Sequence, residues 1–353
     1  MRYKLQSLRG ISALVIVIGH TPFLLIKEEI ANTDLAVDFF FILSGFVMTF
    51  AYQQKIVDGF SIKKYFLLRL GRLYPLHIIT LILWGGGYEV FKIIMGIGSQ
   101  FPEENNLRSF ISNIFLVHSF GIHDSLNWNF PSWSISSEFY TYILFYILLI
   151  SLDRKRKVIV PFIISIIGYS VLLNNNSTTI ALTFDSGFIR CVAGFYLGVA
   201  VFRLSNRYSM KINKQIGYYE ITSFLLLFLL IIFLPKDIAY FDLLYCIAFA
   251  FMVCVFSQEG NGFLGKILNQ KKLIDIGVYS YSIYLLHIFV ILFFENIFIS
   301  VFHVLPESIK GFYSLILNTL ICIITIIISK YSYKFVEGYF RKQSKKIVTR
   351  LND

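Results

Sequence analysis

The sequence has few charged residues, few cysteines and few prolines. Only 15% of its 353 residues are charged and 56% are hydrophobic, whereas soluble domains have about 25% charged and roughly 45–50% apolar residues. This balance excludes an ordinary water-soluble enzyme and predicts an all-helical, polytopic integral membrane protein. The cysteines Cys191, Cys246, Cys254 and Cys322 lie in apolar runs, without a CxxC pair or histidines at metal-ligand spacing. They are expected to be buried small side chains, with no metal bound.

Several functional signatures are also missing. The sequence contains no GxSxG, HExxH or GxxxxGK[ST] motif, which leaves serine hydrolase, zinc peptidase and P-loop mechanisms unsupported. It has no internal repeat and no matched pair of broken helices of the kind found in many transporters. The net charge of +11 does not indicate nucleic acid, because the basic residues fall in short loops between apolar segments.

Ten apolar segments are long enough to cross a bilayer. They cover residues 5–26, 36–53, 73–95, 134–152, 158–174, 187–203, 217–234, 239–256, 276–298 and 311–332. Residues 109–121 are short and polar-spotted, so they are expected to form an interfacial or re-entrant element. The long segment 96–133 is the only loop with room to contribute to a site.

The basic residues predict the orientation of these segments. With the N-terminus in the cytoplasm, most of the 32 Lys and Arg residues fall on the cytoplasmic side, as the positive-inside rule requires. The outer side or the outer helix halves keep only Lys27, Lys92, Arg108, Arg190, Lys236 and Lys310. We therefore expect about ten transmembrane helices, with both termini cytoplasmic. Residues 1–335 would form the transmembrane domain and 336–353 a short basic cytoplasmic tail.

Two ionisable residues, Arg9 and His20, stand inside the first apolar segment. They are eleven residues apart, so at about 100° and 1.5 Å per residue they share one helix face and lie roughly 16 Å apart in depth. Ionisable groups at such positions usually face a cavity and mark a functional path. The alternative is a snorkelling Arg9 and a structural, hydrogen-bonded His20.

Further ionisable residues fall into two layers. The outer layer holds His20, Asp38, Glu138, Arg190 and His287, in which Asp38 and Arg190 could form a structural ion pair. The inner layer holds Arg9, Lys63, Lys64, Arg69 and Arg72.

The two layers predict an anionic ligand taken from the cytoplasm and proton chemistry near the outer face. Arg69 and Arg72 are three residues apart on one helix face and suit a phosphate group, although positive-inside charge is an equal alternative. His20 suits a general base, with Glu138 or Asp38 orienting it.

Six pieces of the sequence, in order, carry a family resemblance. They are LRGISALVIVIGH, VDFFFILSGF, RLGR followed by YP, WSISSEFY, FIRCVAGFYLG and GVYSYSIYLLH, and together they span residues 8–287. In these motifs the chain resembles the acyltransferase family 3 membrane O-acyltransferases, which include O-antigen acetylases.

The resemblance implies ten core helices in the bacterial inner membrane. It implies transfer of an acyl group, usually acetyl, from coenzyme A to a hydroxyl of an extracytoplasmic glycan or glycolipid. Arg9 and His20 match the pair implicated in activity, Arg69 and Arg72 match the motif thought to bind coenzyme A phosphates, and Glu138 matches the acidic residue of the WSxxxE motif. Asp38, Arg190 and His287 match recurrent polar positions. Some members carry a fused extracytoplasmic domain, which this sequence is expected to lack.

The resemblance leaves details open. A transient acyl-histidine is an alternative to direct transfer. Arg190, Ser134, Ser136 or Ser137 could stabilise the oxyanion. Trp128, Trp133, Tyr140 and Tyr142 could stack on sugars or, more simply, anchor the protein at the interface.

Other functions stay open beside this one. The acceptor could be O-antigen, capsule, exopolysaccharide, peptidoglycan, a periplasmic glucan or a small secreted metabolite. A transporter or flippase of lipid-linked sugars is the competing function, and a catalytically silent relative is a third.

Overall fold

The computed structural model describes residues 3–23, 33–88, 93–94, 102–152, 156–175, 178–213, 215–235, 238–260 and 262–351. Every regular element in these residues is helical. The main helices are α1 (Tyr3–His20), α2 (Ala36–Val57), α3 (Ile62–Ile82), α5 (Leu107–Ile114), α6 (Trp133–Ser151), α7 (Arg156–Leu173), α8 (Gly187–Asn213), α9 (Ile216–Phe233), α10 (Ala239–Phe256), α11 (Phe263–Leu268), α12 (Lys271–Ser300), α13 (Gly311–Ser332) and α14 (Gly338–Arg350). Short 3₁₀ turns cover Thr33–Leu35, Phe130–Ser132 and Pro306–Ser308, and π-helices cover Leu83–Tyr88 and Tyr333–Glu337.

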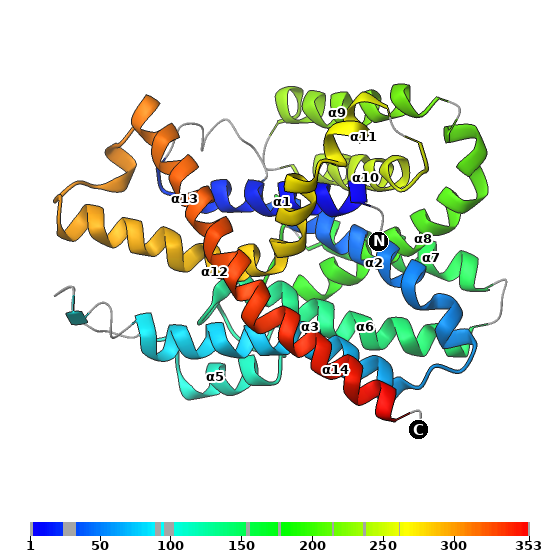
Figure 1. Ribbon diagram of the computed structural model, residues 1–353, viewed down its shortest axis with the longest axis horizontal. Helices are drawn as coiled ribbons and strands as arrows, with labels where there is room; N and C mark the ends of the chain where they lie inside the picture. Colours follow the sequence, from blue (N-terminus) through cyan, green and yellow to red (C-terminus); the bar gives the residue numbers. More distant parts are fainter. Residues whose placement is uncertain are drawn as a thin grey trace.

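Each of the ten predicted apolar segments coincides with a helix (Figure 1). Among the described residues, eight helices are long and apolar enough to cross a membrane. The two that fall outside this set are α1, which carries Arg9, and α7, whose apolar part is Ile159–Leu173. Residues 24–26 of the first predicted segment, and residues 89–92 and 95 of the third, lie outside the described residues. An all-helical membrane protein is thus confirmed.

One predicted boundary needs correction. Helix α3 begins at Ile62 and not near residue 73, because the charges of Lys63, Lys64, Arg69 and Arg72 hide its first three turns from a hydropathy reading. Segment 109–121 contains the end of α5, which has eight residues. At about 1.5 Å per residue such a helix is roughly 12 Å long, too short to cross a bilayer.

Helices α1 and α12 run in the same direction and touch through glycines. A Cβ placed on Gly10 would lie 2.6 Å from the backbone nitrogen of Gly277, and one on Gly277 would meet the carbonyl of Gln6. Small residues at a crossing allow two membrane helices to approach backbone to backbone. This contact sets the register between the two helices. His20 and His287 each lie ten residues beyond their glycine, so the register brings them to the same level.

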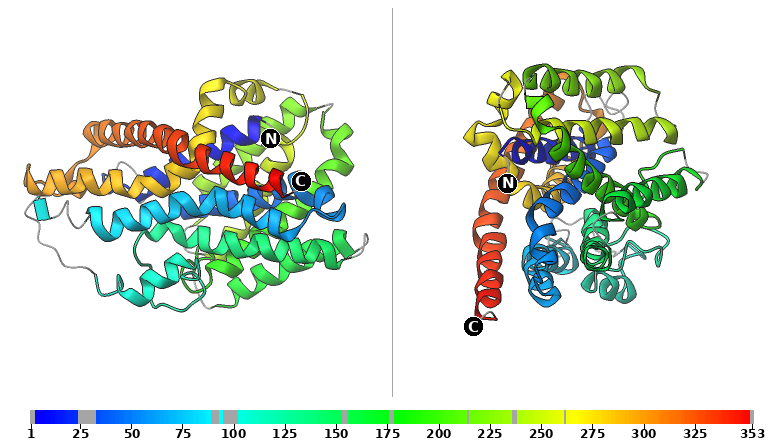
Figure 2. Two further views of the ribbon diagram at one scale, coloured as in Figure 1. Left: turned by 60° about the horizontal axis from the view of Figure 1, so that its bottom comes forward. Right: turned by 90° about the vertical axis from the view of Figure 1, so that its right-hand side faces the viewer.

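The C-terminal elements fold back over the bundle. Helix α13 continues through the π-helix Tyr333–Glu337 into α14, which packs along α3 (Figure 2). Figures 1 and 2 show that α1 begins and α14 ends toward the same end of the bundle. On the other face, α9 exposes apolar side chains such as Leu225, Phe228 and Ile232, as a lipid-facing helix does.

Candidate functional site

A cavity lies among five helices in the middle of the bundle. Counted with its opening, it encloses about 690 Å³. Its walls come from α1, α2, α3, α6 and α12, and the lining residues are Arg9, Val37, Phe40, Phe41, Leu43, Ser44, Val47, Met48, Arg72, Ser134, Ile135, Glu138, Tyr142, Ser280, Tyr281 and Tyr284. On α2 these residues run from Val37 to Met48, which is roughly 16 Å of helix. The cavity is therefore elongated along the helices.

One carboxylate, that of Glu138, lines this cavity. Glu138 Oε1 accepts hydrogen bonds from Ser44 Oγ and from Tyr142 Oη, each at 2.5 Å. The two hydroxyl oxygens are 2.9 Å apart. A carboxylate held by two charge-assisted hydrogen bonds keeps one orientation. Glu138 thus lies with Arg9 and Arg72 in one cavity, although the sequence placed it in the outer layer with His20.

The two arginines of the RLGR motif differ in their surroundings. Arg72 lines the cavity together with Arg9, whose guanidinium carbon is 5.9 Å from the centre of the Phe40 ring. Arg69 is buried beside the cavity wall, and it donates to Tyr52 Oη at 2.6 Å and to Met48 Sδ at 3.2 Å. Three residues turn a helix by about 300°, so the two side chains diverge by about 60°. Arg69 and Arg72 therefore lie on neighbouring parts of the helix surface, and only Arg72 faces the cavity.

His20 and His287 form a pair at the ends of the tight α1–α12 contact. Their ring centres are 5.1 Å apart. His20 Nδ1 is 2.9 Å from the carbonyl of Ile16, and His287 Nδ1 is 2.7 Å from the carbonyl of Tyr284. A carbonyl can only accept, so each Nδ1 donates its proton to that carbonyl, and in a neutral ring of this tautomer the lone pair is on Nε2. The Nε2 of His287 is buried without a hydrogen-bond partner.

This geometry corrects one expectation. The group that orients His20 is the carbonyl of Ile16, not the carboxylate of Glu138 or Asp38. A backbone acceptor one turn back on the same helix is available to any histidine in this position, so no acidic partner is required. His20 is also outside the cavity wall. Tyr284 lines the cavity and stands 6.1 Å, ring centre to ring centre, from His287.

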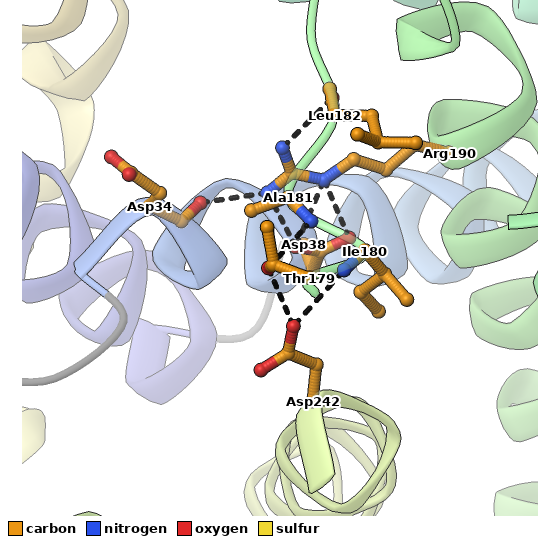
Figure 3. A network of polar contacts seen from close by, with 8 residues as sticks. All are labelled: Asp34, Asp38, Thr179, Ile180, Ala181, Leu182, Arg190 and Asp242. Atoms are coloured by element: carbon orange, nitrogen blue, oxygen red, sulfur yellow. Dashed lines mark hydrogen bonds and ion pairs between the residues drawn. The ribbon is translucent and has the colours of Figure 1, made fainter. Parts of the chain in front are cut away.

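Asp38 and Arg190 form the expected buried ion pair, with Arg190 Nη2 at 2.7 Å from Asp38 Oδ2 (Figure 3). The Nε of Arg190 is 3.2 Å from both carboxylate oxygens of Asp38. Arg190 also donates to the carbonyls of Leu182 and Asp34. Figure 3 also shows Asp242, which accepts from Thr179 Oγ1 at 2.6 Å, and Thr179 lies in the same chain segment as Leu182.

This network joins α2, α8 and α10 with all of its main groups satisfied. Neither Asp38 nor Arg190 lines the cavity. Their position indicates a structural task, and the catalytic role predicted for Asp38 stays a prediction that no contact supports.

The residues around the WSxxxE motif have separate environments. Ser134 lines the cavity and donates to Tyr284 Oη at 2.9 Å. Ser136 and Ser137 instead bond to the carbonyl of Leu116 and to Ser119, away from the cavity. Trp133 is buried, with its ring centre 5.3 Å from the Arg190 guanidinium. Trp133 is therefore neither an exposed sugar platform nor an interfacial anchor.

Sequence reasoning missed several residues of the site. Ser44, Ser280 and Tyr284 supply cavity hydroxyls, and their only signal was a position inside motifs read for other residues. Glu337 is buried, accepts a hydrogen bond from Ser282, and lies within electrostatic reach of Arg72 and Arg9. The only sequence feature that could have indicated Glu337 is its position as a single acidic residue after a long apolar segment. Among the described residues, no group of three or more His, Cys, Asp or Glu side chains is placed to hold a metal ion.

Comparisons with known proteins show the family of this chain. The family model of the acyltransferase domain, acyltransferase 3, matches residues 2–331, so the chain belongs to this family. A provisionally named O-acetyltransferase of Staphylococcus aureus is 26% identical over 377 residues, which cover 98% of this chain. A Rhizobium radiobacter protein, protein 2 in the picA locus, is 36% identical over 104 residues, which cover 29% of this chain and 53% of that protein.

An uncharacterised Haemophilus influenzae protein is 28% identical over 252 residues, which cover 63% of this chain and 98% of that protein. The chain spans 58% of the length of the staphylococcal relative. No solved structure matches the chain.

Proposed function

We propose that this protein transfers an acetyl group from cytoplasmic acetyl-CoA to a hydroxyl of a glycan or glycolipid on the outer side of the bacterial inner membrane. In this proposal ten helices cross the bilayer, residues 1–335 form the transmembrane domain, and both termini are cytoplasmic. A reporter fused to the C-terminus that is active only in the cytoplasm tests the orientation.

The observation that carries the proposal is the elongated cavity with arginines in its wall. Arg9 and Arg72 supply positive charge, and Glu138, Ser44, Ser134 and Tyr142 supply polar groups along an otherwise apolar wall. Coenzyme A has the matching chemistry, because its phosphates are anionic and its thioester lies at the end of a long, flexible arm. Guanidinium groups bind phosphates through charge-assisted, often bidentate hydrogen bonds. Membership of the acyltransferase 3 family supports the same donor class.

The proposed chemistry uses His20 of the His20–His287 pair, which would lie toward the outer side of the membrane. His20 Nε2 takes the proton of the acceptor hydroxyl while the hydroxyl oxygen attacks the thioester carbonyl carbon. A C–O bond forms, the C–S bond breaks, and the proton passes from His20 to the departing thiolate of coenzyme A. The Ile16 carbonyl holds His20 in the tautomer that this step needs, as the orienting residue of a catalytic triad does.

The test is acetyl transfer by membranes that contain the wild type or His20→Asn. His303→Asn is the matched control, since His303 is an exposed histidine outside the cavity. Loss of a general base typically costs about 10² to 10⁴-fold, so labelled acetyl groups should disappear from surface glycans in the His20 variant and persist in the control. Equal labelling in all three would overturn the assignment of His20.

The same experiment separates the competing functions. Unchanged glycan acetylation in the His20 variant together with altered glycan export would favour a flippase of lipid-linked sugars. If wild-type membranes consume acetyl-CoA but leave glycans unlabelled, the acceptor is a small secreted metabolite. A wild type that neither binds nor consumes acetyl-CoA would refute the proposed donor.

A further inference from the structure

The basic C-terminal segment forms a helix that lies directly on α3, between the two arginines of the RLGR motif. A Cβ placed on Gly71 would lie 2.5 Å from the Cβ of Ser344, so α14 approaches α3 closely at this point. Gly71 immediately precedes Arg72 and follows Arg69 by two residues. The C-terminal helix is thereby fixed at the level of the predicted phosphate-binding residues.

One basic residue of α14 lies on the face that contacts α3. Glu337, Ser344 and Val348 are the buried residues of this segment, and Arg341 fills the position between the first two. The spacing of four, three and four residues places all of them on one helix face. Arg341 is half-buried, whereas the other basic side chains beyond it are exposed; these are Lys342, Lys345, Lys346 and Arg350.

The charges around Arg341 do not balance. Arg341 lies within electrostatic reach of Arg72, Arg69 and Glu337, and Arg72 shares the cavity with Arg9 and Glu138. Four arginines thus face two carboxylates, a surplus of two positive charges. Partly buried like charges are unfavourable unless an opposite charge joins them. An anionic ligand with more than one negative charge would satisfy this cluster.

We propose that Arg341 is a third phosphate-binding arginine of the acyl-donor site, presented by the C-terminal helix. This inference rests on the proposed function, and it names the end of the donor involved, which is the phosphorylated nucleotide end of acyl-CoA. Arg72 of α3 and Arg341 of α14 would hold the phosphates between the two helices, and Arg69, which is held by Tyr52 and Met48, would add positive charge beside them. The C-terminal helix would then be part of the enzyme's binding site for its donor.

The test compares Arg341→Ala with Lys342→Ala in the full-length purified protein. Both variants remove one positive charge from α14, but only Arg341 is on the face toward α3. We expect Arg341→Ala to raise KM for acetyl-CoA about tenfold or more with little change in kcat, because lost binding common to ground and transition states appears in KM. Lys342→Ala should match the wild type. Arg341→Lys should be intermediate, since it keeps the charge and loses the bidentate geometry.

Three results would overturn the inference. The first is an Arg341→Ala KM equal to that of Lys342→Ala while the wild type is active. The second is a lowered kcat at unchanged KM, which indicates a role in helix packing alone. The third concerns the case in which Arg341→Ala does not accumulate. In that case, binding of coenzyme A by Arg341→Lys as tight as that of the wild type would overturn the inference. A wild type inactive with acetyl-CoA would instead refute the proposed function, so the two failures are distinguishable.

Discussion

Replacing Gly10 by alanine should separate the two histidines without changing either of them. The new Cβ would lie 2.6 Å from the Gly277 nitrogen, and an ordinary contact begins at 3.4 Å. Helices α1 and α12 must therefore move apart by about 0.8 Å, because backbone atoms at a packed crossing cannot rotate away. The shift is transmitted to His20 and His287, ten residues along each helix.

The expected loss follows from this displacement. A misplacement of about 1 Å in a reacting geometry can cost about 10²-fold in rate, so Gly10→Ala should lower kcat by at least about tenfold. Gly277→Ala meets the Gln6 carbonyl at a closer approach and should lower kcat further. Gly86→Ala has nothing within 4 Å and should leave kcat unchanged.

The assay is transfer of labelled acetyl groups by membranes, normalised to the amount of folded protein and run over a range of acetyl-CoA concentrations. The order expected for kcat is Gly86→Ala, then Gly10→Ala, then Gly277→Ala, from high to low. Wild-type kcat in Gly277→Ala, with the protein accumulating normally, would refute the reasoning that the glycine contact sets the spacing of the pair.

Three further predictions concern the charged and buried groups. Asp38→Ala leaves Arg190 buried without its carboxylate partner and should lower the free energy of unfolding by about 3–5 kcal/mol. Denaturation in detergent measures this change, and an unchanged midpoint would contradict a structural role for the pair. Glu138→Gln removes a negative charge from the cavity that also holds Arg9 and Arg72, and it keeps an acceptor oxygen for Ser44 and Tyr142. The KM for acetyl-CoA should therefore fall or stay unchanged, and a raised KM would argue against phosphate binding in this cavity. Burial, with a contribution from His77, lowers the pKa of His118 from 6.5 to about 3. The unfolded chain therefore binds more protons between these values, and the stability of loop 116–129 is complete above pH 6.5 and is lost as the pH falls toward 3. Hydrogen exchange of this loop, corrected for its intrinsic pH dependence, should accelerate on acidification, and His118→Asn should reduce this acceleration.

The positions of the helices were largely predictable. Each of the ten predicted apolar segments coincides with a helix. The reason is that a membrane helix must satisfy its backbone hydrogen bonds internally and present apolar side chains to lipid. The prediction failed at the start of α3, where Lys63, Lys64, Arg69 and Arg72 lie inside the helix. Hydropathy averages the residue types in a window, so it does not show that Arg72 faces a cavity and that Arg69 bonds to a neighbouring helix.

The members of the site were more predictable than their groupings. Arg9, Arg72, Glu138 and Ser134 line one cavity, and Asp38 pairs with Arg190 as expected. The pairing of His20 with His287, and the bonding of Glu138 to Ser44 and Tyr142 in place of His20, were not predictable from depth alone. Residues at similar depth on different helices can face opposite sides of the bundle.

The sequence by itself determined the class of fold, the helices and the residues that carry charge into the membrane, because helix formation and membrane partition depend on local residue type and period. Only the tertiary structure decided which of these residues meet. The glycine contact between α1 and α12 brings His20 to His287, and the packing of α14 on α3 brings Arg341 to Arg72. Such meetings depend on the register between helices far apart in the chain, and that register is set by side-chain packing at their crossings.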